Sequence, residues 1–101
     1  MIGRTTSSRA LVLTAPRELE FRDLPVPHPE VDGALLRVEA CGLCGTDHEM
    51  FTGHLPLRTP MVPGHETVGV LVEVGDAAAE SWGVAVGDRV AVECFRSCRR
   101  C

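Results

Sequence analysis

Short runs of alternating or β-branched residues dominate the first part of the chain. Residues 10–15 form a β-prone run that a proline closes, and residues 18–22 alternate between polar and apolar positions, as a half-buried strand does. Residues 34–40 form a third run, which leads directly into Cys41. The pattern therefore predicts three strands in this part, preceded by a flexible polar lead over residues 1–9.

The middle of the chain predicts one short helix followed by a loop. Residues 45–52 suit one or two helical turns, with Thr46 or Asp47 as the N-cap and Gly53 as the residue that ends the helix. Prolines recur between Gly53 and Pro63, and proline interrupts the regular hydrogen bonding of helices and sheets. We therefore expect this stretch to be a loop.

Three further segments complete the pattern. Residues 67–74 are rich in β-branched side chains and predict a strand, which a turn at Gly75 and Asp76 would end. Residues 77–83 are ambiguous, and residues 86–92 suit a turn that leads into a strand. Many short strands separated by glycine and proline favour a mainly β fold, with a small barrel-like architecture and one or two short helices.

Composition and charge argue against several classes of protein. The 101 residues are enough for one small domain, the net charge is −4, and the ten basic residues are scattered. Without a basic stripe or many aromatic rings, the chain is not expected to bind nucleic acid. No segment approaches the roughly 18 apolar residues that a membrane span needs, so we expect no membrane association. No G-x-G-x-x-G run follows a strand, so the chain itself shows no dinucleotide site.

The cysteines point to a reducing compartment. Their number, five, is odd, which argues against a disulfide framework. The spacings Cys41-x-x-Cys44 and Cys98-x-x-Cys101 are typical of metal or redox sites, and we expect a cytoplasmic protein. Two interpretations stay open here. A zinc ribbon would use all four thiols, although the gap between the pairs exceeds fifty residues. A thioredoxin-like pair would need a βαβ unit, which the pattern lacks.

A second pattern joins two short turns that are flanked by glycine. The first turn carries Cys44 and Asp47, and the second carries His65 and Glu66. Thiolate, imidazole and carboxylate are ligands that zinc accepts, and a catalytic zinc needs three protein ligands with one open position. Cys44 and His65 supply two. No other strong ligand is visible, so we expect the site to be incomplete within this chain.

Three motifs resemble a known family. The run 42–47 (GLCGTD) resembles the catalytic-zinc turn of zinc-dependent medium-chain alcohol and polyol dehydrogenases, and the run 64–66 (GHE) resembles their zinc signature. The run 87–90 (GDRV) resembles the strand before their structural-zinc lobe, where Cys98 and Cys101 match the first two of four thiolate ligands. The resemblance implies a GroES-like partial β-barrel over residues 10–101, incomplete at its C-terminal end and truncated before the family's Rossmann domain.

The resemblance also implies roles for individual residues. Cys44 and His65 would hold a catalytic zinc, with Glu66 close to the metal as a transient ligand. A ligating imidazole commonly donates its other N–H to a carboxylate, and Asp47 matches that position. The alternatives are a buried structural thiol, a surface or core histidine, a solvated acid at a strand end, and, for Asp47, a helix cap.

Proton transfer is the part of the site where the sequence departs from the family. Thr46 matches the hydroxyl that takes the proton of the alcohol. The family often continues this relay to a histidine, but the matching position here is Glu49. His48 lies one residue early, and one residue turns a helical side chain by about 100°. Either Glu49 relays the proton, or the path runs through the cofactor ribose and water.

The function implied is oxidation of the CH–OH group of a small alcohol or polyol, with NAD(P) as cofactor. The full-length protein would carry a second, structural zinc and could be a homo-oligomer, and the chain alone is not expected to be active. An alternative from a different class is a stand-alone β module that zinc stabilises and that binds a partner. A third possibility is an inert fragment.

Overall fold

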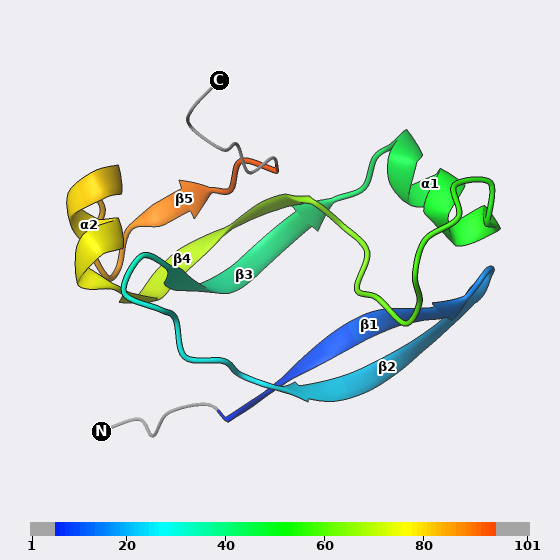
Figure 1. The fold of residues 1–101 in the computed structure, drawn as a ribbon, viewed down its shortest axis with the longest axis horizontal. Helices are drawn as coiled ribbons and strands as arrows, with labels where there is room; N and C mark the ends of the chain where they lie inside the picture. The colour runs from blue at the N-terminus through cyan, green and yellow to red at the C-terminus, as the bar shows by residue number, and fades with distance from the viewer. Residues whose placement is uncertain (1–5, 95–101) are drawn as a thin grey trace. The chain divides into compact units, whose positions relative to one another are not determined.

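The computed structural model describes residues 6–94, and Figure 1 traces the order of their elements. This part of the chain is mainly β, with two short helices, as the sequence predicts. The chain divides into two compact units, of which one comprises residues up to 28 with 43–64, and the other residues 29–42 with 65 onward. The elements are β1 (Ser7–Ala15), β2 (Glu18–Pro25), β3 (Ala34–Gly42), α1 (Gly45–Thr52), β4 (Glu66–Val74), α2 (Asp76–Trp82) and β5 (Arg89–Ala91).

The first unit is built on an antiparallel hairpin of β1 and β2. Its register runs from Ser7 opposite Pro25 to Ala15 opposite Glu18. Strand β1 therefore begins inside the segment 1–9 that we expected to be a polar lead. The reason is that β2 is long enough to pair with these polar residues, and a strand exposed to solvent tolerates them.

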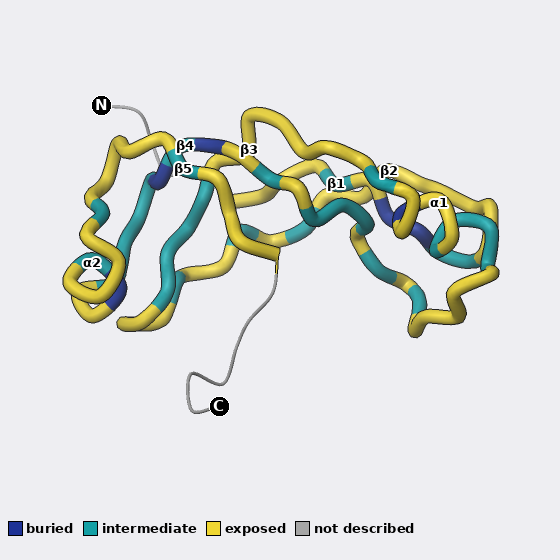
Figure 2. The backbone as a smooth tube through the Cα atoms, turned by 90° about the horizontal axis from the view of Figure 1, so that it is seen from above, coloured by how far each residue is buried: buried dark blue, intermediate teal, exposed yellow. Residues whose placement is uncertain are grey.

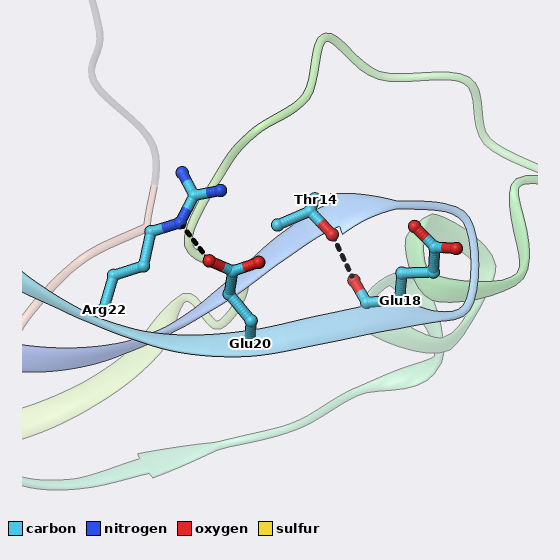
Figure 3. Close-up of polar contacts among 4 residues, drawn as sticks. All are labelled: Thr14, Glu18, Glu20 and Arg22. Carbon is cyan, nitrogen blue, oxygen red and sulfur yellow. Dashed lines mark hydrogen bonds and ion pairs between the residues drawn. The ribbon is translucent and has the colours of Figure 1, made fainter.

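Polar side chains along the hairpin form local contacts at its surface (Figure 3). The Thr14 hydroxyl donates to the Glu18 carbonyl over 3.3 Å. On β2, the Arg22 guanidinium pairs with the Glu20 carboxylate at 2.8 Å, because residues two apart on a strand share a face. These contacts are exposed, so we expect each to contribute little to stability.

Backbone hydrogen bonds attach the loop and helix α1 to this hairpin. Leu13 exchanges two bonds with Met61, with N···O distances of 2.7 and 3.0 Å, and the Arg17 N–H donates to the Phe51 carbonyl over 2.7 Å. Val12 and Leu13 are the buried apolar residues of this unit within the described ranges. The loop that carries Met61 is therefore fixed to β1 although it has little regular structure.

The second unit is an antiparallel sheet in the order β3–β4–β5, with helix α2 after β4. The expected turn at Gly75 and Asp76 is wrong, because Gly75 is the N-cap of α2 and Asp76 is its first residue. Alanines favour a helix here. The N–H groups of Ala77 and Ala78 both donate to the Val31 carbonyl, which anchors the helix to the segment before β3. The structure also resolves the ambiguous segment 77–83, which is mostly helical.

An ion pair connects the two outer strands of the sheet. Arg89 on β5 donates to both carboxylate oxygens of Glu39 on β3, at 2.8 and 3.2 Å. The hydrogen bond from Arg89 holds the pKa of Glu39 below its ordinary value, and Glu39 in turn raises the pKa of Arg89. Both groups therefore stay charged at neutral pH.

Gly69 in the middle strand cannot be replaced without disturbing the sheet. A Cβ atom at this position would collide with the backbone carbonyl of Arg37 on β3. We expect Gly69→Ala to lower the free energy of unfolding by about 2 kcal/mol, as overpacked core positions do. Urea denaturation measures the change. Gly45→Ala is the matched control, since nothing lies within 4 Å of its added Cβ, and equal losses in both variants would contradict the explanation.

Few residues of either unit are buried, and most of the described backbone in Figure 2 has the colours of intermediate or exposed residues. In the second unit, Leu71 and Ala78 are the buried apolar residues among those described. So few buried side chains give limited hydrophobic stabilisation. Within residues 6–94, neither helix reaches the length and apolar content that a bilayer crossing requires.

Candidate metal centre

Helix α1 begins at the cysteine of the first motif. Cys44 is the N-cap, with the extended backbone angles φ −123° and ψ 179°. The expected N-caps, Thr46 and Asp47, instead lie inside the helix. Asp47 occupies the third helical position, where its carboxylate accepts the Cys44 N–H over 3.0 Å. The carboxylate that accepts the cap residue's N–H thus lies three residues after the cap itself. The sequence rule placed the cap at Thr46 or Asp47 because it looked for a polar side chain at the cap position, which is a cysteine here.

The carboxylate of Asp47 joins the two glycine-flanked turns. One oxygen, Oδ2, accepts the Cys44 N–H, and the other, Oδ1, accepts the Gly64 N–H, both over 3.0 Å. The residue is 6% exposed, so these charge-assisted bonds are shielded from water. His65 follows Gly64 directly, so the hydrogen bond to the Gly64 N–H also constrains the backbone at His65. The structure thus shows the capping role of Asp47, while its role toward an imidazole stays a prediction.

The sheet of the second unit independently fixes the start of β4. Glu66 pairs with Gly42, the last residue of β3. A Cβ on Gly42 would lie 3.3 Å from the Glu66 Cβ and 3.5 Å from its Oε2, so the Glu66 side chain lies along Gly42. The start of β4 is therefore fixed beside Gly42, the residue that lies two positions before Cys44 in the sequence.

Three potential ligand atoms meet here. One atom each from Cys44, His65 and Glu66 lies within 4.8 Å of the other two. Zinc binds sulfur at about 2.3 Å and nitrogen or oxygen at about 2.0–2.2 Å, so ligands around it stand roughly 3.5 Å apart. One thiolate, one imidazole and one carboxylate therefore fit a zinc ion with an open fourth position. The transient role that the resemblance implies for Glu66 stays a prediction.

The other cysteines lie outside this cluster. Cys41 is exposed, and its sulfur lies 3.5 Å from the hydroxyl of Thr67. None of Cys41, Cys44 and Cys94, the cysteines that the structure describes, forms a disulfide. Cys98 and Cys101 lie outside the described residues, so their place in a structural zinc site stays a prediction.

The proposed proton-transfer residues lie on the exposed part of α1. Thr46 and Glu49 are both exposed and stand three positions apart, which places them on neighbouring parts of the helix surface. The Glu49 carboxylate lies 3.4 Å from Nδ1 of His54, a residue that sequence reasoning did not single out. The sequence feature that could have pointed to His54 is Gly53, because a glycine that ends a helix reverses the chain and directs the next residue back toward the helix.

An apolar pocket of about 250 Å³ opens beside Cys44 in the first unit. Leucine, phenylalanine and proline side chains make up most of its wall. The lining residues are Leu11, Leu13, Leu19, Leu43, Cys44, Asp47, His48, Phe51 and Pro63.

Comparisons with known proteins agree with these motifs. The family model described as alcohol dehydrogenase GroES-like domain matches residues 30–101. The chain therefore belongs to the alcohol dehydrogenase GroES-like domain family, and the resemblance indicated by the motifs is confirmed, as is the expected fold class.

Individual relatives share most of this chain. It is 59% identical over 93 residues to "Probable alcohol dehydrogenase adh" of Mycobacterium tuberculosis, which covers 92% of the chain and 25% of that protein. An alcohol dehydrogenase of Escherichia coli CFT073, solved with NADH, has a TM-score of 0.83 at 30% identity, covering 96% of this chain and 27% of that one. A cobalt- and zinc-bound alcohol dehydrogenase of Pyrobaculum aerophilum has a TM-score of 0.82 at 28% identity, covering 94% of this chain and 29% of that one. The chain thus spans about a quarter of their length.

Proposed function

We propose that this chain is the zinc-binding part of an NAD(P)-linked oxidoreductase that oxidises the CH–OH group of a small alcohol or polyol. The observation that carries the proposal is the double hydrogen bond of Asp47, which holds the Cys44 turn to Gly64 and so to the start of the His65 motif. The family membership and the solved relatives with zinc and NADH support it.

Each residue of the cluster has a defined task in this proposal. Cys44, His65 and Glu66 would hold the zinc ion, which when bound would act as a Lewis acid and lower the pKa of the substrate hydroxyl. Thr46 would accept the hydroxyl proton, and the nicotinamide of NAD(P) would supply the hydride acceptor. Asp47 keeps the ligand-bearing turns together. The roles of Cys98 and Cys101 in a second zinc site, a cytoplasmic location and a homo-oligomer belong to the same proposal.

Cobalt substitution tests the metal site in the protein encoded by the complete reading frame. After chelation and reconstitution with Co²⁺, we expect the near-ultraviolet absorption of a cobalt–thiolate bond and recovery of NAD(P)-dependent alcohol oxidation. Chelation alone should abolish that activity. Retention of full activity without any metal, or no alcohol oxidation by the zinc-loaded protein, would contradict the proposal.

A stand-alone zinc-stabilised module is the second candidate, and the small number of buried apolar residues favours it. Metal binding can supply folding free energy that a small core lacks. If the 101-residue chain folds only with zinc and binds a partner, and the complete reading frame adds no nucleotide-binding domain, this candidate replaces the first. Circular dichroism with and without zinc follows the folding.

A further inference from the structure

Strand β2 has an outer backbone edge that pairs with no other strand among the described residues. Leu13 on β1 lies opposite Leu19, and the N–H and carbonyl of Leu13 both bond Met61, on the side away from β2. Leu13 and Leu19 therefore form a non-hydrogen-bonded pair, in which both residues direct their polar backbone groups outward. Because such pairs alternate along an antiparallel ladder, the N–H and carbonyl groups of Leu19, Phe21 and Asp23 all point away from β1.

The charges on this edge are complementary to a second copy of the same edge in one register. Glu20 and Arg22 lie on the same face of β2, one before and one after Phe21 in the sequence (Figure 3). If two β2 strands pair antiparallel with Phe21 opposite its own copy, each Glu20 faces the Arg22 of the other chain. A register centred on Glu20 or on Arg22 would set like charges directly opposite, which is destabilising. The charges therefore select the register centred on Phe21.

Both ends of the edge limit the ladder to this segment. Arg17, at the β1–β2 turn, has a left-handed backbone with φ 63°, so the chain turns away there. Pro25, the last residue of β2, has no N–H to donate, and proline ends pairing at a sheet edge. Between these ends, Leu19 would exchange backbone hydrogen bonds with Asp23 of the second copy, and Phe21 with its own copy.

Phe21 supplies apolar surface at the centre of this ladder. The residue is 62% exposed, and the Arg9 guanidinium lies over its ring, 4.2 Å from the centroid. Leu19, on the same face of the strand, is 45% exposed. Pairing would bring two phenylalanine rings together at the symmetry axis, and aromatic pairs across neighbouring strands stabilise sheets.

We propose that strand β2 is an interface at which two copies of this protein join their sheets by antiparallel pairing about a two-fold axis at Phe21. Such an axis gives both copies the same contacts, so the assembly closes at two subunits across this edge. The inference rests on the proposed function only in that a homo-oligomer is part of it. Its tests measure molar mass and amide exchange rather than alcohol oxidation, so the interface and the proposed function can fail separately.

Charge reversal tests the register in the protein encoded by the complete reading frame. A ladder this short buries little surface, so association across it should be reversible and increase with protein concentration. Arg22→Glu sets like charges opposite each other, and we expect the dissociation constant of this step, measured by sedimentation velocity, to rise about tenfold or more. Adding Glu20→Arg to that variant makes the pairs opposite in charge again and should restore the wild-type value. Arg58→Glu, which reverses an exposed charge in the loop after α1, is the matched control and should leave association unchanged.

Amide hydrogen exchange with single-residue resolution measures the edge directly. In the associated wild type, the outward amides of Leu19, Phe21 and Asp23 should be protected, and Arg22→Glu should make them exchange at least about tenfold faster. The amides at positions 20 and 22 point toward β1, so they should stay protected in both proteins. Their protection shows that the hairpin is intact in the variant.

Four results would overturn the proposal. A wild type that is monomeric at every concentration is the first, and an assembly that Arg22→Glu leaves unchanged is the second. The third is a double variant that associates as weakly as Arg22→Glu alone, because charge would then not select the register. The fourth is protection of the outward amides in a monomer, because another segment of the same chain would then cover the edge.

Discussion

Replacing Cys44 by serine should abolish alcohol oxidation in the complete enzyme and remove the catalytic zinc. Serine is a favourable N-cap, so helix α1 should begin where it does now, while the thiolate is lost. Metal activation contributes several kcal/mol to catalysis, and each 1.36 kcal/mol is a factor of ten. We therefore expect activity to fall by at least about a thousandfold. Elemental analysis and initial rates measure the two losses.

Cys41→Ser is the matched control for this prediction. Cys41 belongs to the same C-x-x-C run, but its sulfur contacts Thr67 and lies outside the ligand cluster. We expect this variant to keep its zinc and its rate. If Cys41→Ser instead loses the metal as completely as Cys44→Ser does, the four-cysteine or paired-thiol interpretation regains support, and the cluster with His65 and Glu66 loses it.

The strands were predictable because their side chains obey simple rules. The run 34–40 reads as a strand and extends as β3, and the β-branched run 67–74 forms β4. Boundaries were harder, since they depend on partners far away in sequence. Ser7 is a strand residue because Pro25 lies opposite it, and no local pattern shows that pairing. The N–H of Gly75 likewise donates to the carbonyl of a distant residue, Gly33, over 2.8 Å, so no local pattern showed how this residue is held.

The candidate site was predictable in its residue types and less so in its connections. Spacing and glycine context singled out Cys44 and His65. The double role of Asp47 depends on the loop after α1 that brings Gly64 back to the helix, and propensity rules do not describe such a return. The contact of His54 with Glu49 likewise arises from a helix C-cap, which sets a direction only after the helix end is known.

Asp47→Asn should lower both the stability of the metal-free chain and its affinity for zinc. The asparagine amide keeps the shape of the carboxylate but retains a single acceptor oxygen, so either the Cys44 or the Gly64 N–H loses its buried partner. A buried donor left unpaired costs about 1–3 kcal/mol. We expect a loss of about 2 kcal/mol in urea denaturation and a 10–100-fold weaker zinc affinity, the range that the loss of groups supporting metal ligands commonly causes.

Asp88→Asn provides the control for the Asp47 variant. Its carboxylate also accepts a backbone N–H, from Ala85 over 2.9 Å, but at an exposed turn where water can replace it. Its stability should change by less than about 0.5 kcal/mol, as exposed substitutions usually do. The decisive comparison is made without metal. If Asp47→Asn is as stable as the wild type when zinc is absent and weaker only when zinc is present, the two turns are assembled by the metal. If it is already less stable, the carboxylate holds the ligand-bearing turns together before the ion arrives.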